Sequence, residues 1–192
     1  MNRTLLTLVF SIFTGLTGCR NAENPVKETG AEKQFYPIGG FIESQLHYLD
    51  SVPLPVIYYT TVNNITDTAI IEKSEFRKTV AIEFIRSDIS GEEQKKNYTE
   101  TSFIDATLGA ITLNYTPEKN SPDLPVKKID VLLKQENAAI STIYIEKITR
   151  AGDSVILKKM LWNANKSCQV TSLIQKNNEP DKVVQERFVW DE

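Results

Sequence analysis

The C-terminal third of the chain alternates between apolar and polar positions in five runs. Such alternation, in stretches rich in β-branched and aromatic residues, predicts strands whose successive side chains point to opposite faces of a sheet. Only a few turn-forming residues separate one run from the next. Because so short a connection cannot hold a parallel crossover, we expect an antiparallel meander. The runs are Lys128–Lys134, Ile140–Thr149, Ser154–Trp162, Ser167–Gln175 and Val183–Trp190.

The first half of the chain contains two helix-like patterns. From Ile38, apolar residues recur at spacings of three and four until Pro53, which ends the predicted helix. The glycine pair in its first turn weakens that turn and indicates close approach by another group. The second helix is predicted to begin at an N-cap, Ser74, and to stop near Gly91.

Three further segments lie before the meander. Val56–Val62 and Thr68–Glu72 are typical of strands, and the turn-forming residues between them predict a hairpin. Leu108–Tyr115 alternates clearly and predicts another strand. Tyr98–Asp105 has no clear period, which leaves a loop or a short helix.

Together these elements predict an α+β fold: an antiparallel β-meander of about seven to eight strands, with the two helices of the N-terminal half packed on one face. A sheet of this length also curls readily into a half-barrel. We expect Val170 and Phe188 on the helix-covered face, and Thr171, Glu186 and Lys158 on the solvent face.

The start of the chain has the pattern of an export signal, with Arg3 followed by an apolar run, Leu5–Leu16. A helix of about 12 residues rises about 18 Å, short of the ~30 Å that a membrane-spanning helix must cover. Leu16-Thr17-Gly18-Cys19 resembles the lipobox of bacterial lipoproteins. This resemblance implies that residues 1–18 are removed as a signal peptide and that Cys19 carries the lipid anchor. A plain secretory signal is the alternative.

Residues 19–34 are predicted to be a flexible, lipidated tether. After Cys19 the only apolar side chains in this segment are alanine and valine, and Pro25 and Gly30 interrupt it. Such a segment cannot bury enough apolar surface to order itself. Residues 35–192 are then expected to form a single α+β domain.

Charge and composition exclude some classes of partner. The 192 residues include 22 Lys and Arg and 25 Asp and Glu, so that the net charge is −3. The two signs are interspersed, which argues against nucleic-acid binding and against a polybasic membrane surface. The membrane contact that we expect is therefore the lipid on Cys19.

The chain offers few residues for familiar chemistry. His47 is the single histidine, so a Ser-His-Asp or Cys-His hydrolase lacks a base, and we expect His47 to be solvated. The sequence contains neither a zinc-type His and Cys cluster nor a glycine-rich phosphate loop. We therefore expect no catalytic, cofactor-binding or metal-binding residues. A catalytic site built on two carboxylates remains an alternative, because the sequence does not reveal which acidic side chains lie together.

Cys168 is the second cysteine of the chain. If Cys19 carries lipid, Cys168 has no partner for a disulfide. It lies in an alternating stretch, which favours a small buried apolar side chain, with a reactive thiol as the alternative.

From Phe35 onward the chain resembles a family of uncharacterised Bacteroidetes lipoproteins. The resemblance is carried by Phe35-Tyr36-Pro37, by Tyr98–Asp105 and by Met160-Leu161-Trp162. It implies a lipoprotein of the cell envelope and brings no activity with it. Surface lipoproteins of that group often carry an acidic export signal after the cysteine, whereas Arg20–Asn24 contains one acid. This favours an anchor that faces the periplasm rather than the cell surface. The residue after the cysteine, Arg20, is also not the aspartate that retains enterobacterial lipoproteins in the inner membrane, so by analogy we expect the outer membrane.

These observations lead to two hypotheses about function. The first is a membrane-anchored envelope lipoprotein that is not an enzyme and binds a protein partner or an apolar ligand. The second is a hydrolase that depends on carboxylates alone. A cleft holding two carboxyl groups favours the second, and an apolar cavity between helices and sheet favours the first.

Overall fold

A computed structural model describes residues 35–105, 107 and 109–191. The predicted signal peptide, the tether and Cys19 lie outside these residues. The described residues form an α+β fold with one antiparallel sheet that does not close into a barrel. Its strands are β1 (Val56–Val62), β2 (Ile65–Ile71), β3 (Tyr98–Asp105), β4 (Ala110–Pro117), β5 (Val126–Lys134), β6 (Ile140–Ala151), β7 (Ser154–Asn163), β8 (Ser167–Lys176) and β9 (Lys182–Val189).

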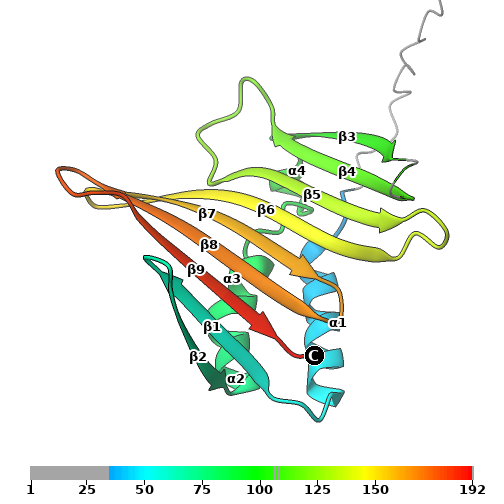
Figure 1. The fold of residues 1–192 in the computed structure, drawn as a ribbon. Coiled ribbons are helices and arrows are strands. Elements are labelled where there is room, and N and C mark those ends of the chain that lie inside the picture. Colours follow the sequence, from blue (N-terminus) through cyan, green and yellow to red (C-terminus); the bar gives the residue numbers. More distant parts are fainter. Residues whose placement is uncertain (1–34, 106, 108, 192) are drawn as a thin grey trace, which may run out of the picture. The chain divides into compact units, whose positions relative to one another are not determined.

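The strands lie in the order β2-β1-β9-β8-β7-β6-β5-β4-β3 (Figure 1). From β3 to β9 each strand pairs with the next one along the chain, as the short connections predict. The early hairpin pairs with the last strand, since β1 lies antiparallel to β9. Strands β2 and β3 therefore lie at opposite edges, and the chain between them crosses the whole sheet.

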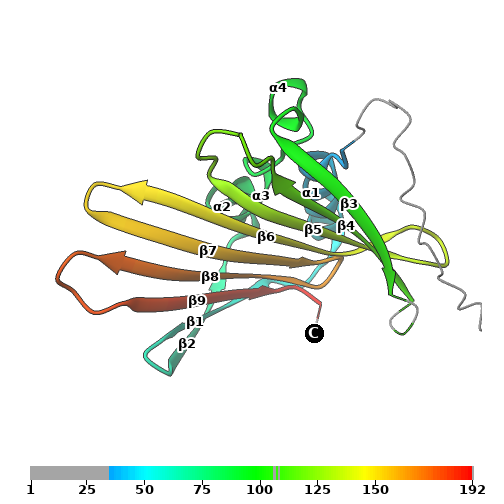
Figure 2. The same ribbon diagram turned by 90° about the horizontal axis from the view of Figure 1, so that it is seen from above.

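That crossing segment and the first helix cover one face of the sheet (Figure 2). The connection from β2 to β3 is helical for most of its length, so the crossing satisfies its own backbone hydrogen bonds while covering apolar strands. The helical elements are α1 (Ile38–Ser51), α2 (Lys73–Phe76), η1 (Arg77–Ala81), α3 (Ile82–Ile85) and α4 (Glu92–Lys95).

Helix α1 follows the sequence prediction closely. Ile38, Ile42, Leu46 and Leu49 are buried, and the helix ends just before Pro53. The predicted close approach is found at the first glycine of the pair. The backbone N–H of Gly39 donates to Asp88 over 2.7 Å, and a Cβ on Gly39 would lie 3.0 Å from that carboxylate oxygen.

The second helix differs from the prediction in two ways. Its N-cap is Glu72 rather than Ser74, and it ends at Ile85 rather than near Gly91. The early end has a tertiary cause, because the chain must turn there to bury Ile89 and to bring Asp88 to the start of α1. Its middle turn, η1, is a π-helix that continues directly from α2 into α3.

Tyr98–Asp105 is a strand, where a loop or short helix was expected. It is the edge strand β3, and four of its eight side chains, the consecutive residues 101–104, are exposed. Because successive side chains point to opposite faces, neither face is covered there, and no alternation of apolar and polar residues is needed. Tyr98 is the exception: it is buried, and its hydroxyl donates to the carbonyl of Val126.

The core lies between the helices and the covered face of the sheet. Most of the apolar side chains assigned to that face are buried, including Val170 and Phe188. Aromatic rings fill its centre, with ring centroids 5 to 6 Å apart among Phe76, Phe84 and Trp162. Such tilted aromatic contacts add to the stability gained by burial itself.

Two side chains were assigned to the wrong face. The strand register places Glu186 opposite the covered residue Val170. It places Lys158 opposite Ser172, which is on the same face of β8 as Val170. Glu186 and Lys158 therefore both point toward the helices. The period of two already requires this, because Glu186 and Phe188 are two residues apart in the same strand.

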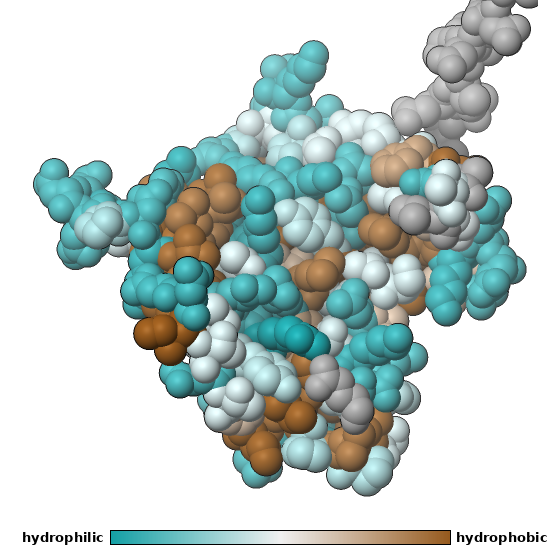
Figure 3. All heavy atoms as spheres, viewed as in Figure 1, coloured by the Kyte–Doolittle hydropathy of each residue, from teal (hydrophilic) through white to brown (hydrophobic). Residues whose placement is uncertain are grey.

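The opposite face of the sheet is polar, as expected. Asn114 donates to Asp130 over 2.6 Å, and the hydroxyl of Tyr144 donates to Glu146. The space-filling view from the side of Figure 1 shows hydrophilic atoms mixed with smaller hydrophobic patches (Figure 3).

Candidate functional site

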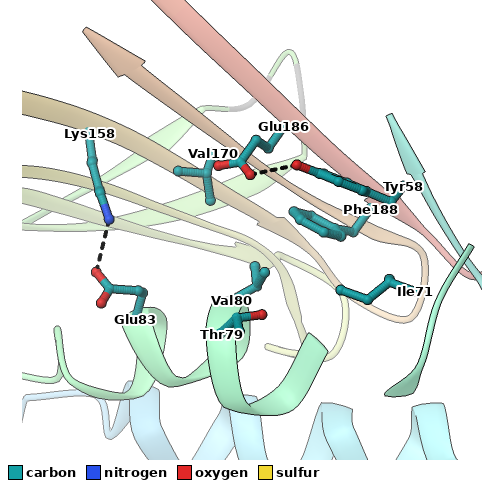
Figure 4. Close-up of a pocket in the computed structure, with 9 residues that line it drawn as sticks. All are labelled: Tyr58, Ile71, Thr79, Val80, Glu83, Lys158, Val170, Glu186 and Phe188. Atoms are coloured by element: carbon teal, nitrogen blue, oxygen red, sulfur yellow. Dashed lines mark hydrogen bonds and ion pairs between the residues drawn. The ribbon is translucent and has the colours of Figure 1, made fainter. Parts of the chain in front are cut away.

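A pocket of about 190 Å³ lies between the second helix and the covered face of the sheet (Figure 4). Its helical wall comes from η1 and α3, and its other walls come from strands at the β2–β1–β9–β8–β7 side of the sheet. The residues that line it are Tyr58, Ile71, Thr79, Val80, Glu83, Lys158, Val170, Glu186 and Phe188.

Apolar and aromatic side chains form the larger part of this lining. Phe188 is 1% exposed, and its ring stacks on that of Tyr58 with centroids 4.7 Å apart and planes 9° apart. Val170 is also buried, while Ile71 and Val80 are partly buried and pack against the core. The pocket therefore offers a rigid apolar wall to any molecule that enters it.

Glu83 lies on the helical side of the pocket, within reach of two lysines of the sheet. Its Oε2 is 3.3 Å from Nζ of Lys158 and 3.7 Å from Nζ of Lys147. Burial opposes ionisation of this carboxyl, but the positive charges of Lys158 and Lys147 outweigh burial, and the pKa of Glu83 is lowered. Glu83 is thus an ionised group whose charge is already balanced.

Glu186 approaches the pocket from strand β9 and has a different partner. The hydroxyl of Tyr58 donates to Glu186 Oε1 over 2.8 Å. Burial, together with this carboxylate, raises the pKa of Tyr58, so the phenol stays protonated as a donor. Among the described residues no lysine or arginine forms an ion pair with Glu186.

The π-helical turn lies against this pocket. Thr79 and Val80 both belong to η1, and Glu83 follows one turn later in α3. π-Helical turns are rare and occur frequently at functional sites, because their wider ring is less stable than an α-helical turn. The coincidence of the π-turn with the pocket supports a functional role for this place.

The two candidate residues discussed in the sequence analysis, His47 and Cys168, do not line the pocket. His47 is exposed on α1 and does not line the pocket. Cys168 is buried next to Phe188 in register, and burial raises the pKa of its thiol, which argues against a reactive thiol. The pocket carboxylates Glu83 and Glu186 were not identified as candidates, although the two-residue spacing from Phe188 was a usable signal for Glu186.

Two larger hollows lie elsewhere on the described part of the chain. One, of about 360 Å³, lies beside Tyr98 and Val126, and the other, of about 750 Å³, lies around the turn that contains Asn163–Ser167. Their linings come mainly from turns and from the ends of elements. Neither is lined by a stacked pair of aromatic rings such as Tyr58 and Phe188.

Two further properties bear on function. Within residues 35–105, 107 and 109–191, no three His, Cys, Asp or Glu side chains are grouped so as to hold a metal ion. The helices in that part of the chain are too short or too polar to cross a membrane. No family model, curated protein or solved structure matches the chain.

Proposed function

We propose that this protein is a lipid-anchored lipoprotein of the cell envelope whose helix–sheet pocket binds a small, partly apolar ligand. The observation that carries the binding proposal is the pocket itself, in which the buried ring of Phe188, stacked on the partly buried ring of Tyr58, faces the π-helical turn. The lipobox at Cys19 and the lack of an acidic export signal support attachment to the outer membrane with the domain facing the periplasm.

The alternative, a carboxylate-dependent hydrolase, finds one favourable observation and one unfavourable one. Glu83 and Glu186 do line the same pocket. A general acid at neutral pH requires a carboxyl whose pKa is raised, whereas the pKa of Glu83 is lowered and Glu186 accepts a hydrogen bond from Tyr58. Binding is therefore the function that the geometry supports better.

The size of the pocket suggests a direct test. A cavity of about 150 Å³ accommodates benzene, so a pocket of about 190 Å³ has room for benzyl alcohol. The full chain, methyl-labelled and held in phospholipid nanodiscs, is dialysed against known concentrations of benzyl alcohol. We expect saturable NMR shifts at Ile71, Val80 and Val170, with a Kd on the order of millimolar.

Two variants control this experiment. Val80→Trp fills the pocket and should abolish the shifts, whereas Ile70→Trp, on the exposed side of β2, should leave them unchanged. Shifts that persist in Val80→Trp, or that appear only away from the pocket, would rule out the pocket as the binding site.

A further inference from the structure

The charged groups around the pocket are unevenly placed. Lys158 and Lys147 both lie against Glu83, at the helical end of the pocket. Among the described residues, the carboxyl of Glu186 has one hydrogen-bond partner, the phenol of Tyr58, and no lysine or arginine forms an ion pair with it. The β9 side of the pocket therefore presents a carboxyl group that has no cationic partner in contact.

Glu186 is half-buried, and several of its neighbours are apolar. It lies opposite Val170 in register and next to the stacked rings of Tyr58 and Phe188. A carboxylate beside apolar surface is poorly solvated, and a positive partner with hydrogen-bond donors relieves that cost. Oε1 accepts from Tyr58, which leaves Oε2 and further lone pairs for another donor.

The other groups of the pocket favour a cation at Glu186. The hydroxyl end of Tyr58 meets the carboxylate, and Phe188 stacks on that ring, so an apolar body held there would lie against aromatic rings (Figure 4). An anion would meet the carboxylate of Glu186 at this end, and at the other end the lysines are already engaged by Glu83. The carboxylate without a cationic partner and the position of the lysines thus favour a cation.

We propose that the ligand of this pocket is a small organic cation, with a protonated amine on Glu186 and a compact apolar body against Val170, Val80 and Phe188. This inference rests on the proposed binding function and specifies the chemical class of the ligand. A ligand of about the size of benzylamine matches the 190 Å³ volume.

Three probes of equal size and different charge test the proposal. Benzylamine, benzyl alcohol and benzoate are compared at pH 7 with the full chain in nanodiscs, with free concentrations set by dialysis. We expect benzylamine to bind about tenfold more tightly than benzyl alcohol, which is a typical gain for one charge-assisted hydrogen bond. Benzoate should bind about tenfold more weakly than the alcohol.

Glu186→Gln removes the charge and keeps an oxygen that accepts the hydrogen bond of Tyr58. In this variant benzylamine should bind no more tightly than benzyl alcohol, while binding of the alcohol is unchanged. Glu146→Gln is the matched control, since Glu146 also accepts from a tyrosine but lies on the opposite face of the sheet. It removes the same charge and should preserve the tenfold preference.

The outcomes separate the two proposals. Equal binding of the amine and the alcohol to the unaltered chain overturns the cation inference and leaves the pocket as a binding site. Tightest binding of benzoate overturns it too, in favour of the lysines. If none of the three probes binds, the binding function itself is wrong. If Glu186→Gln fails to fold, the comparison of the three probes on the unaltered chain still decides.

Discussion

Phe188 connects the wall of the pocket to the aromatic core. Its ring stacks on Tyr58 and lies 5.3 Å from that of Phe76. We expect Phe188→Ala to lower the free energy of unfolding by about 3 to 5 kcal/mol, because it removes a fully buried ring and leaves a cavity. Urea denaturation measures this. Val183→Ala, in the same strand but 51% exposed, should change the value by less than about 0.5 kcal/mol, and equal effects would contradict the assigned face.

Glu83 should make stability depend on pH. Burial alone would raise the pKa of Glu83, but Lys158 and Lys147 lower it below the ordinary value of 4.5. A carboxyl with a lowered pKa in the folded state stabilises the fold while it is ionised, and this contribution is lost as the pH falls through the lowered pKa. Glu83→Gln should therefore cost about 1 kcal/mol at pH 7 and progressively less below pH 4.5.

The measurement is urea denaturation of both proteins at several pH values. Glu93→Gln is the control, because Glu93 pairs with Lys96 on an exposed surface and should have little effect at any pH. A cost of Glu83→Gln that stays constant from pH 7 into the acid range would show that packing, rather than charge, explains it.

Among the elements, the π-turn η1 is the one whose geometry is least favoured by the backbone. The buried residues Phe76, Ala81 and Phe84 are spaced by five and then by three positions. Deletion of the exposed Lys78 would bring these spacings to four and three, the apolar pattern of an ordinary α-helix. The π-turn is thus equivalent to one inserted residue, which changes the placement of Thr79 and Val80 at the pocket.

Deletion of Lys78 should therefore separate stability from binding. We expect the free energy of unfolding to stay the same or to rise by about 1 kcal/mol, as the π-turn becomes a regular α-helical turn. We expect benzyl alcohol to bind about tenfold more weakly, since the pocket wall shifts. Urea denaturation and the NMR titration measure the two effects. Lys78→Ala keeps the π-turn and should leave binding unchanged, and unaltered binding in the deletion variant would show that the pocket does not need η1.

At the scale of the whole molecule, the attachment to the membrane depends on one residue in our proposal. Cys19→Ala removes the thiol that would carry the lipid, and no described helix is long and apolar enough to replace it. We expect the variant to leave the detergent phase in a phase-partition assay, or to accumulate with its signal peptide uncleaved. Cleaved protein that stays in the membrane fraction would contradict lipid anchoring at Cys19.

The alternating pattern by itself determined most of the sheet. Short connections between runs such as Ser154–Trp162 and Ser167–Gln175 allow only antiparallel neighbours, and the apolar residues that recur at alternate positions indicate the covered face. Helix α1 was equally readable, since Pro53 ends it and its apolar stripe is continuous. These features are local, and local rules are sufficient for them.

Features that depend on distant neighbours required the tertiary structure. The edge strand β3 has no alternation because both of its faces are exposed at residues 101–104, and the second helix ends early because Asp88 must reach Gly39. The π-turn is invisible in a pattern that assumes uniform helical spacing. Each of these depends on a contact between segments far apart in the chain.

The candidate site was partly predictable from the sequence. The two-residue period places Glu186 beside Phe188, so its face was determined by sequence. Its pairing with Tyr58, and the meeting of Glu83 with Lys147 and Lys158, bring together residues that are 128, 64 and 75 positions apart, respectively. The charges in a pocket come from such distant groups, and only the folded chain decides which carboxylate lies against lysines and which does not.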